Sequence, residues 1–176
     1  MHLLCRALII NIKYSQNTKG NKHMSCNSCN SSCSTCNRKN TCNKSVQTAY
    51  NSVAQTITSN ANIVVLGNLA TDSGCSIHTQ NDGFVIRNSG IYRISYDVTF
   101  TNTSAGTAIL MLYKDAVALP CANAEETVAE GSTTTLHAET TICIPTCCNF
   151  NPLISARMTA PAGTIINVCA NVTRIS

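Results

Sequence analysis

The chain has 176 residues, of which 44% are hydrophobic and 11% are charged, and its formal net charge is +4. A chain of this length buries one core, so we expect one globular domain with a tail. From Met24 onward the sequence holds eight basic and eight acidic residues. This balance excludes the strongly basic surface that is typical of nucleic-acid-binding proteins and of proteins bound to anionic membranes.

Residues 1–23 differ in composition from the rest of the chain. Their longest apolar stretch, Leu3–Ile12, is interrupted by Arg6 and is shorter than the roughly 18 residues that cross a bilayer. It also lacks the preceding basic cluster and the following small-residue cleavage site of a Sec signal peptide. We therefore expect residues 1–23 to be a mis-assigned leader or a disordered segment, with the natural start at Met24.

Residues 24–45 are rich in Cys, Asn and Ser and almost free of apolar side chains, which predicts a flexible arm rather than a packed unit. The cysteines follow the spacing C-x2-C-x3-C-x2-C-x5-C. Three uses remain open: disulfide cross-linking, a loose thiolate metal site at the first four positions, and a passive reduced tail. The three-residue spacer between the C-x2-C pairs is shorter than the roughly 12–20 residues of structural zinc sites, so cross-linking is favoured. The arm cysteines are Cys26, Cys29, Cys33, Cys36 and Cys42.

Twelve cysteines in total are a high density for a protein that stays in a reducing compartment. Without a signal peptide, two settings fit: a virion protein that is released by lysis, and a spore-surface protein that is deposited inside a mother cell. The vicinal pair Cys147-Cys148 would strain the peptide between its members if it formed a disulfide. We expect each to cross-link to another cysteine, such as Cys143 or Cys169; the other reading is that these cysteines are small buried residues that never oxidise.

From Val46 to Ser176, turns with Gly, Asn and Asp separate apolar runs of strand length, which is typical of a sandwich or barrel. Val46, Tyr50, Val53 and Ile57 have the spacing of a short coiled coil, but weak helix formers between them favour a first strand over Val53–Thr58.

Three later segments alternate at period two, so each is expected to have one buried face. In the clearest one the inward set is Tyr92, Ile94, Tyr96, Val98 and Phe100. The predicted strands are Ile91–Thr101, Thr133–Ile144 and Gly163–Ile175.

Thr107–Tyr113 and Ile63–Leu66 are apolar on both faces. Their second face must also be covered, either by another subunit or by an overlying loop. We expect an oligomer on this ground.

The sequence has no Gly-rich phosphate loop, no His-Glu-x-x-His and no Gly-x-Ser-x-Gly, so we expect no enzyme, no catalytic residue and no cofactor. His137 and Glu139 lie two residues apart and so share a strand face. They are the start of a metal site or, as we favour, part of a solvated outer face. His78 near Cys75 gives a similar choice between an activated thiol and an ordinary polar turn.

The segments Gly83–Phe100 and Gly106–Ala122 resemble the BclA C-terminal-like family of spore-surface domains, which are of the C1q/TNF-like type. The resemblance rests on Gly90-Ile91-Tyr92 and on Leu112-Tyr113-Lys114-Asp115. Ala116 stands where the family usually has a turn Gly, and Cys121 where Gly often follows Pro. The resemblance implies an antiparallel jelly-roll sandwich that assembles as a homotrimer at the tip of a filament, a stalk or a phage head fibre.

Together these observations predict a non-enzymatic display protein on a virion or on a spore or cell surface, reached without a Sec signal peptide. Its expected partners are two further copies of the chain, a virion or spore-surface scaffold bound through the arm, and a host glycan or surface ligand bound in adhesion. Nucleic acid and a membrane span are not expected. The alternative is a thiol-based metal-binding or redox module on a β scaffold.

Overall fold

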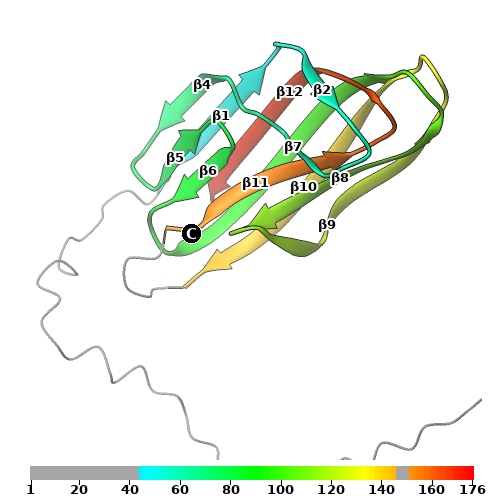
Figure 1. The fold of residues 1–176 in the computed structure, drawn as a ribbon. Helices are drawn as coiled ribbons and strands as arrows, with labels where there is room; N and C mark the ends of the chain where they lie inside the picture. The colour runs from blue at the N-terminus through cyan, green and yellow to red at the C-terminus, as the bar shows by residue number, and fades with distance from the viewer. Residues whose placement is uncertain (1–43, 146–150) are drawn as a thin grey trace, which may run out of the picture. The chain divides into compact units, whose positions relative to one another are not determined.

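The computed structural model describes residues 44–145 and 151–176, and these residues are all-β (Figure 1). Twelve strands form two antiparallel sheets of six strands each, which pack face to face. No helix in the described ranges is long and apolar enough to cross a membrane. The predicted all-β sandwich is confirmed.

One sheet, here called sheet A, has the order β10-β7-β12-β1-β4, with β2 paired to β12. The second, sheet B, has the order β5-β6-β11-β8-β9, with β3 paired to β11. The strands of sheet A are β1 (Val46–Asn51), β2 (Gln55–Ile57), β4 (Asn68–Ser73), β7 (Gly90–Asn102), β10 (Thr133–Ile144) and β12 (Gly163–Arg174). Those of sheet B are β3 (Asn62–Ile63), β5 (Ile77–Gln80), β6 (Gly83–Ile86), β8 (Gly106–Lys114), β9 (Val117–Val128) and β11 (Leu153–Thr159).

The core lies between the two sheets and is built from the inward half of each alternating strand. All five predicted inward side chains of β7 are fully buried. Phe84 of sheet B meets Tyr96 of sheet A edge to face, with ring centroids 6.1 Å apart, an arrangement that aromatic rings prefer. Burial raises the pKa of the Tyr96 hydroxyl far above its ordinary value, so this side chain stays neutral in the core.

The sequence pattern predicted the first strand over Val53–Thr58, and within that range the structure has the short strand β2, Gln55–Ile57. The first strand is instead β1, Val46–Asn51, and Val53 lies outside any strand and is 69% exposed. β1 turns Gln47 and Asn51 inward, where each donates through its side-chain amide to a backbone carbonyl, of Ile77 and of Val65 respectively. Buried amides that are hydrogen-bonded in this way are tolerated in a core, and they conceal the alternation that a strand prediction depends on.

The β8–β9 hairpin keeps its turn without the glycines that such turns favour. Asp115 and Ala116 both have positive φ, 49° and 64°, as the two central residues of a type I′ turn do. Cys121, with φ 60°, lies where β9 bulges and the pairing with β8 shifts between Met111 and Tyr113. The two positions at which this chain departs from the resembled family are therefore left-handed positions, where a side chain is strained.

Candidate functional site

The chain enters the sandwich at one end of the long strands, and a cluster of loops lies at the other end. β12 pairs with β7 from Gly163 opposite Asn102 at one end to Arg174 opposite Tyr92 at the other. A strand of this length spans roughly 36 Å. The chain enters β1 at the Arg174 end, where the Arg174 amide donates to the carbonyl of Ser45 at 2.8 Å.

At the opposite end, Asn102 holds three loops together. Its fully buried side-chain amide donates to the carbonyls of Ser104 and Ala129, and its side-chain oxygen accepts from the Ser132 hydroxyl. The amide of Thr103 donates to the carbonyl of Ala162 at 2.7 Å. The loops after β7, β9 and β11 therefore form one ordered cluster, here called the loop tip.

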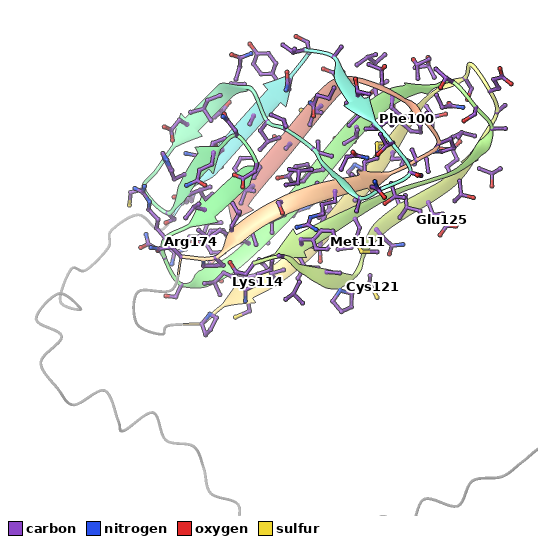
Figure 2. The ribbon with its side chains drawn as sticks, in the orientation of Figure 1. Phe100, Met111, Lys114, Cys121, Glu125 and Arg174 are labelled. Atoms are coloured by element: carbon purple, nitrogen blue, oxygen red, sulfur yellow. The ribbon has the colours of Figure 1, made fainter. Side chains whose placement is uncertain are left out.

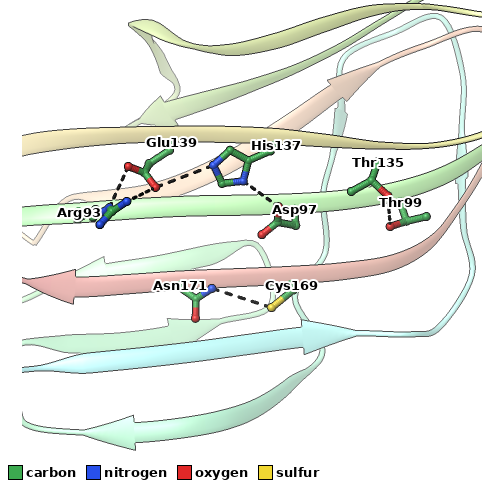
Figure 3. A network of polar contacts seen from close by, with 8 residues as sticks. All are labelled: Arg93, Asp97, Thr99, Thr135, His137, Glu139, Cys169 and Asn171. Atoms are coloured by element: carbon green, nitrogen blue, oxygen red, sulfur yellow. Dashed lines mark hydrogen bonds and ion pairs between the residues drawn. The ribbon is translucent and has the colours of Figure 1, made fainter.

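The outer face of sheet A is polar, and Figure 3 shows its charged part. Arg93 of β7 donates from Nε to Oε1 of Glu139 in β10 and from Nη2 to Oε2 of the same carboxylate, each at 2.9 Å. His137 Nδ1 lies 2.8 Å from Asp97 Oδ1, and His137 Nε2 lies 3.9 Å from Glu139 Oε2. The hydrogen bond from Arg93 lowers the pKa of the Glu139 carboxyl group. Exposed ion pairs of this kind add little to stability, so these four side chains mainly fix the alignment of β7 with β10.

The metal site considered for His137 and Glu139 is not assembled. Among residues 44–145 and 151–176, no group of three or more His, Cys, Asp or Glu side chains is arranged so that it could hold a metal ion. Cys169 lies on the same face, opposite Asp97 in the pairing of β12 with β7. Asp97 therefore stands between the Cys169 thiol and the His137 ring, which is the wrong order for a nucleophile activated by a neighbouring base.

The outer face of sheet B has an apolar strip on β8, which lies between Arg157 of β11 and the exposed polar residues Asn123 and Glu125 of β9. Ile109, Met111 and Tyr113 of β8 are half-buried and point away from the core, as the two-sided pattern of Thr107–Tyr113 predicted. Met111 is labelled on this strand in Figure 2. Arg157 of β11 lies opposite Met111 on one side and opposite Ile63 on the other. Residues directly opposite each other in a ladder share a face, so these side chains form one surface.

The predicted cross-linking cysteines lie outside the described residues. These are Cys26, Cys29, Cys33, Cys36, Cys42, Cys147 and Cys148, and their pairing stays a prediction. Among the described cysteines, Cys75 is disulfide-bonded, which removes the activated thiol considered beside His78. Cys143 and Cys169, suggested as partners for the vicinal pair, carry free thiols, as does Cys121.

Comparison with known proteins rests on the structure, because no family model and no curated protein matches the sequence. The globular domain of zebrafish complement 1qA superposes with a TM-score of 0.57 over 75% of this chain and 98% of its own, at 9% identity. The Eiger TNF of S. frugiperda gives a TM-score of 0.59 over 76% of this chain and 92% of its own, at 8% identity. This chain has the C1q/TNF-like jelly-roll fold. The PRD1 vertex protein P5 shares it too, with a TM-score of 0.53 over 75% of this chain and 97% of its own, at 11% identity.

Arg157 is the surface residue that the sequence reading missed. It belongs to none of the catalytic, phosphate-binding or metal-binding motifs considered in the sequence. The sequence offered one indication, since Arg157 is the one charged residue in the strand LISARMT. The strands beside Arg157 in sheet B belong to the two segments that are apolar on both faces.

Proposed function

We propose that the chain is a non-enzymatic display protein: a homotrimeric jelly-roll head on a virion or spore surface, anchored or cross-linked by its Cys-rich arm. The observation that carries the proposal is the polarity of the sandwich. The chain enters at Ser45, at one end of the strands, and the loop tip lies at the other end. An anchor placed before Ser45 leaves the loop tip pointing away from the anchored surface.

Two further observations support a surface role. The C1q/TNF-like fold is shared with a vertex protein, PRD1 P5, over nearly the whole of that protein. The apolar outer side chains of β8 and the exposed Val117 and Ile166 offer surface that association would remove from water. Adhesion to a host glycan or other surface ligand through the loop tip follows as part of the same proposal. The fold by itself names no ligand.

Light-scattering mass measured with and without reductant tests the assembly, on protein that starts at Met24. We expect three chain masses in both conditions, because apolar contacts rather than disulfides hold the heads together. Larger species that disappear on reduction would be assigned to the arm cysteines. A monomer in both conditions contradicts the proposed head.

Deletion of residues 24–43 tests the arm. We expect the deleted protein to keep the trimer mass but to lose attachment to the virion or spore, with no zinc bound before or after the deletion. Stoichiometric zinc that disappears with the deletion would instead favour the thiol-based metal module.

A further inference from the structure

The head carries a disulfide-bonded cysteine beside the point where the arm enters. Cys75 is exposed, lies between β4 and β5, and is disulfide-bonded. The other three cysteines among residues 44–145 and 151–176 have free thiols. The partner of Cys75 is therefore one of the N-terminal cysteines or one of the vicinal pair Cys147-Cys148.

Both neighbours of Cys75 contact the last two residues of the arm. The Ser76 amide donates to Ser45 Oγ at 3.1 Å, and both serines are buried. On the other side of Cys75, Gly74 has φ 98°, and a Cβ added there would lie 2.6 Å from the carbonyl oxygen of Lys44. The backbone at Lys44 is thus held against the backbone beside Cys75.

Cys42 is the arm cysteine that this contact brings within reach. It stands two residues before Lys44, and a chain extends by roughly 3.3–3.6 Å per residue, so the two Cα atoms are at most about 7 Å apart. The Cα atoms of a disulfide are roughly 4.4–6.8 Å apart, so Cys42 can meet Cys75 without displacing Lys44. The next arm cysteine, Cys36, stands eight residues before Lys44. Closure of a flexible tether falls roughly as the −3/2 power of its length, which favours Cys42 by roughly eight-fold.

The vicinal pair Cys147-Cys148 is the rival partner within the head, and its segment adjoins a different strand. Cys75 lies before β5 and the vicinal pair lies before β11, with β6 between those two strands. Neighbouring strands are roughly 4.8 Å apart, so strands on the two sides of β6 are about twice as far apart. The arm instead leads into β1, which pairs directly with β4, the strand that Cys75 follows (Figure 1). The strand order therefore favours the arm.

We propose that a disulfide between Cys42 and Cys75 fastens the arm to the head at the chain-entry end. The bond forms by thiol–disulfide exchange with a low-molecular-weight disulfide: Cys75 takes up one half of it, the Cys42 thiolate displaces that half, and two small thiols are released. A pull on the arm then reaches sheet A at β4 as well as at β1. This inference deepens the proposed function, because it leaves the two C-x2-C pairs of the arm for attachment, and only that use of them rests on the proposed function.

Tryptic mapping of the non-reduced full chain identifies the partner directly. Free thiols are first blocked with N-ethylmaleimide in denaturant at mildly acid pH, where few thiolates remain to exchange. Trypsin then places the candidates in separate peptides: 40–44 with Cys42, 45–87 with Cys75, 23–38 with the four earlier arm cysteines, and 115–157 with the vicinal pair. We expect peptide 40–44 to be linked to peptide 45–87. A link from 45–87 to any other peptide, or a blocked thiol at Cys75, overturns the proposal.

The variant Cys75→Ser measures what the bond contributes. The bond closes a loop of about 33 residues in the unfolded chain, so we expect Tm to fall by roughly 8–15 °C and Cys42 to become reactive. The matched control is Cys143→Ser, which removes an exposed free thiol and should keep the link and a Tm within about 2 °C of the wild type. In reductant, Cys75→Ser and the wild type should have the same Tm. A difference that persists in reductant contradicts a stabilising disulfide.

Molecular mass separates this proposal from the proposed function. We expect Cys75→Ser to have the same light-scattering mass as the wild type, because the bond lies within one chain. A covalent dimer on a non-reducing denaturing gel that Cys75→Ser abolishes would show a bond between chains, and the proposal would be wrong. A wild-type monomer in which 40–44 is linked to 45–87 removes the homotrimer and leaves the disulfide. A trimer in which Cys75 is linked elsewhere removes the disulfide and leaves the homotrimer.

Discussion

Replacing Ala116 by glycine should stabilise this protein, although it removes a side-chain carbon. Ala116 is exposed and has φ 64° in the β8–β9 turn, and the preceding Asp115 also has positive φ. The left-handed conformation costs a residue with a Cβ about 1–2 kcal/mol. Glycine escapes this cost but loses about 0.5–1 kcal/mol through the greater freedom of the unfolded chain. The net gain is about 0.5–1 kcal/mol, which corresponds to a rise in Tm of about 2–4 °C.

Gly131→Ala provides the matched control in the opposite direction. Gly131 has φ 70°, and an added Cβ would meet no atom within 4 Å, so its substitution changes backbone preference alone. We expect Gly131→Ala to cost about 1 kcal/mol. Urea unfolding of the reduced protein measures both variants, with the midpoint shifting and the m-value unchanged. If Ala116→Gly lowers the midpoint while Gly131→Ala behaves as expected, the strain argument for the turn is wrong.

Three further predictions concern the core and the outer face of sheet A. Leu110→Ala, at a fully buried position, should lower the free energy of unfolding by about 2–5 kcal/mol in urea; a loss below 1 kcal/mol would contradict the two-sheet core. Gly83→Ala should cost at least about 2 kcal/mol, because the new Cβ would clash with the carbonyl of Ile154 and separate β6 from β11; thermal unfolding like that of the wild type would contradict this close approach. Arg93→Gln should raise the pKa of Glu139 toward its ordinary value, as followed by carboxyl ¹³C NMR. Since the folded-state pKa of Glu139 is depressed, its stabilisation is present above the unfolded-state pKa and is lost as the pH falls through the folded-state value, and an unchanged titration in the variant would refute the pairing.

The strands with a clear alternation could be located from the sequence alone. Thr133–Ile144 is β10 with the same limits, and Ile91–Thr101 lies within β7. Alternation works because it is local, since successive side chains of a strand point to opposite faces. β1 escaped prediction because its buried amides at Gln47 and Asn51 depend on acceptors from other parts of the chain.

The candidate surfaces needed the tertiary structure to different degrees. The apolar second face of Thr107–Tyr113 could be predicted from the sequence, because the side chains on both faces of a strand come from one segment of the chain. The position of Arg157 beside two apolar side chains could not be predicted from the sequence, since it depends on which strands pair with β11. Ile63 and Met111, its two neighbours, stand 94 and 46 residues before it in the chain.

The sequence by itself determined that this protein is a β sandwich with a compositionally distinct N-terminal arm, because period-two alternation and turn residues act over a few neighbours. Only the tertiary structure shows which strands pair, that the chain entry and the loop tip lie at opposite ends, and that Arg157 lies beside Ile63 and Met111. These properties arise from contacts between distant segments such as β1 with β12, and the pattern of a single strand carries no information about its partner.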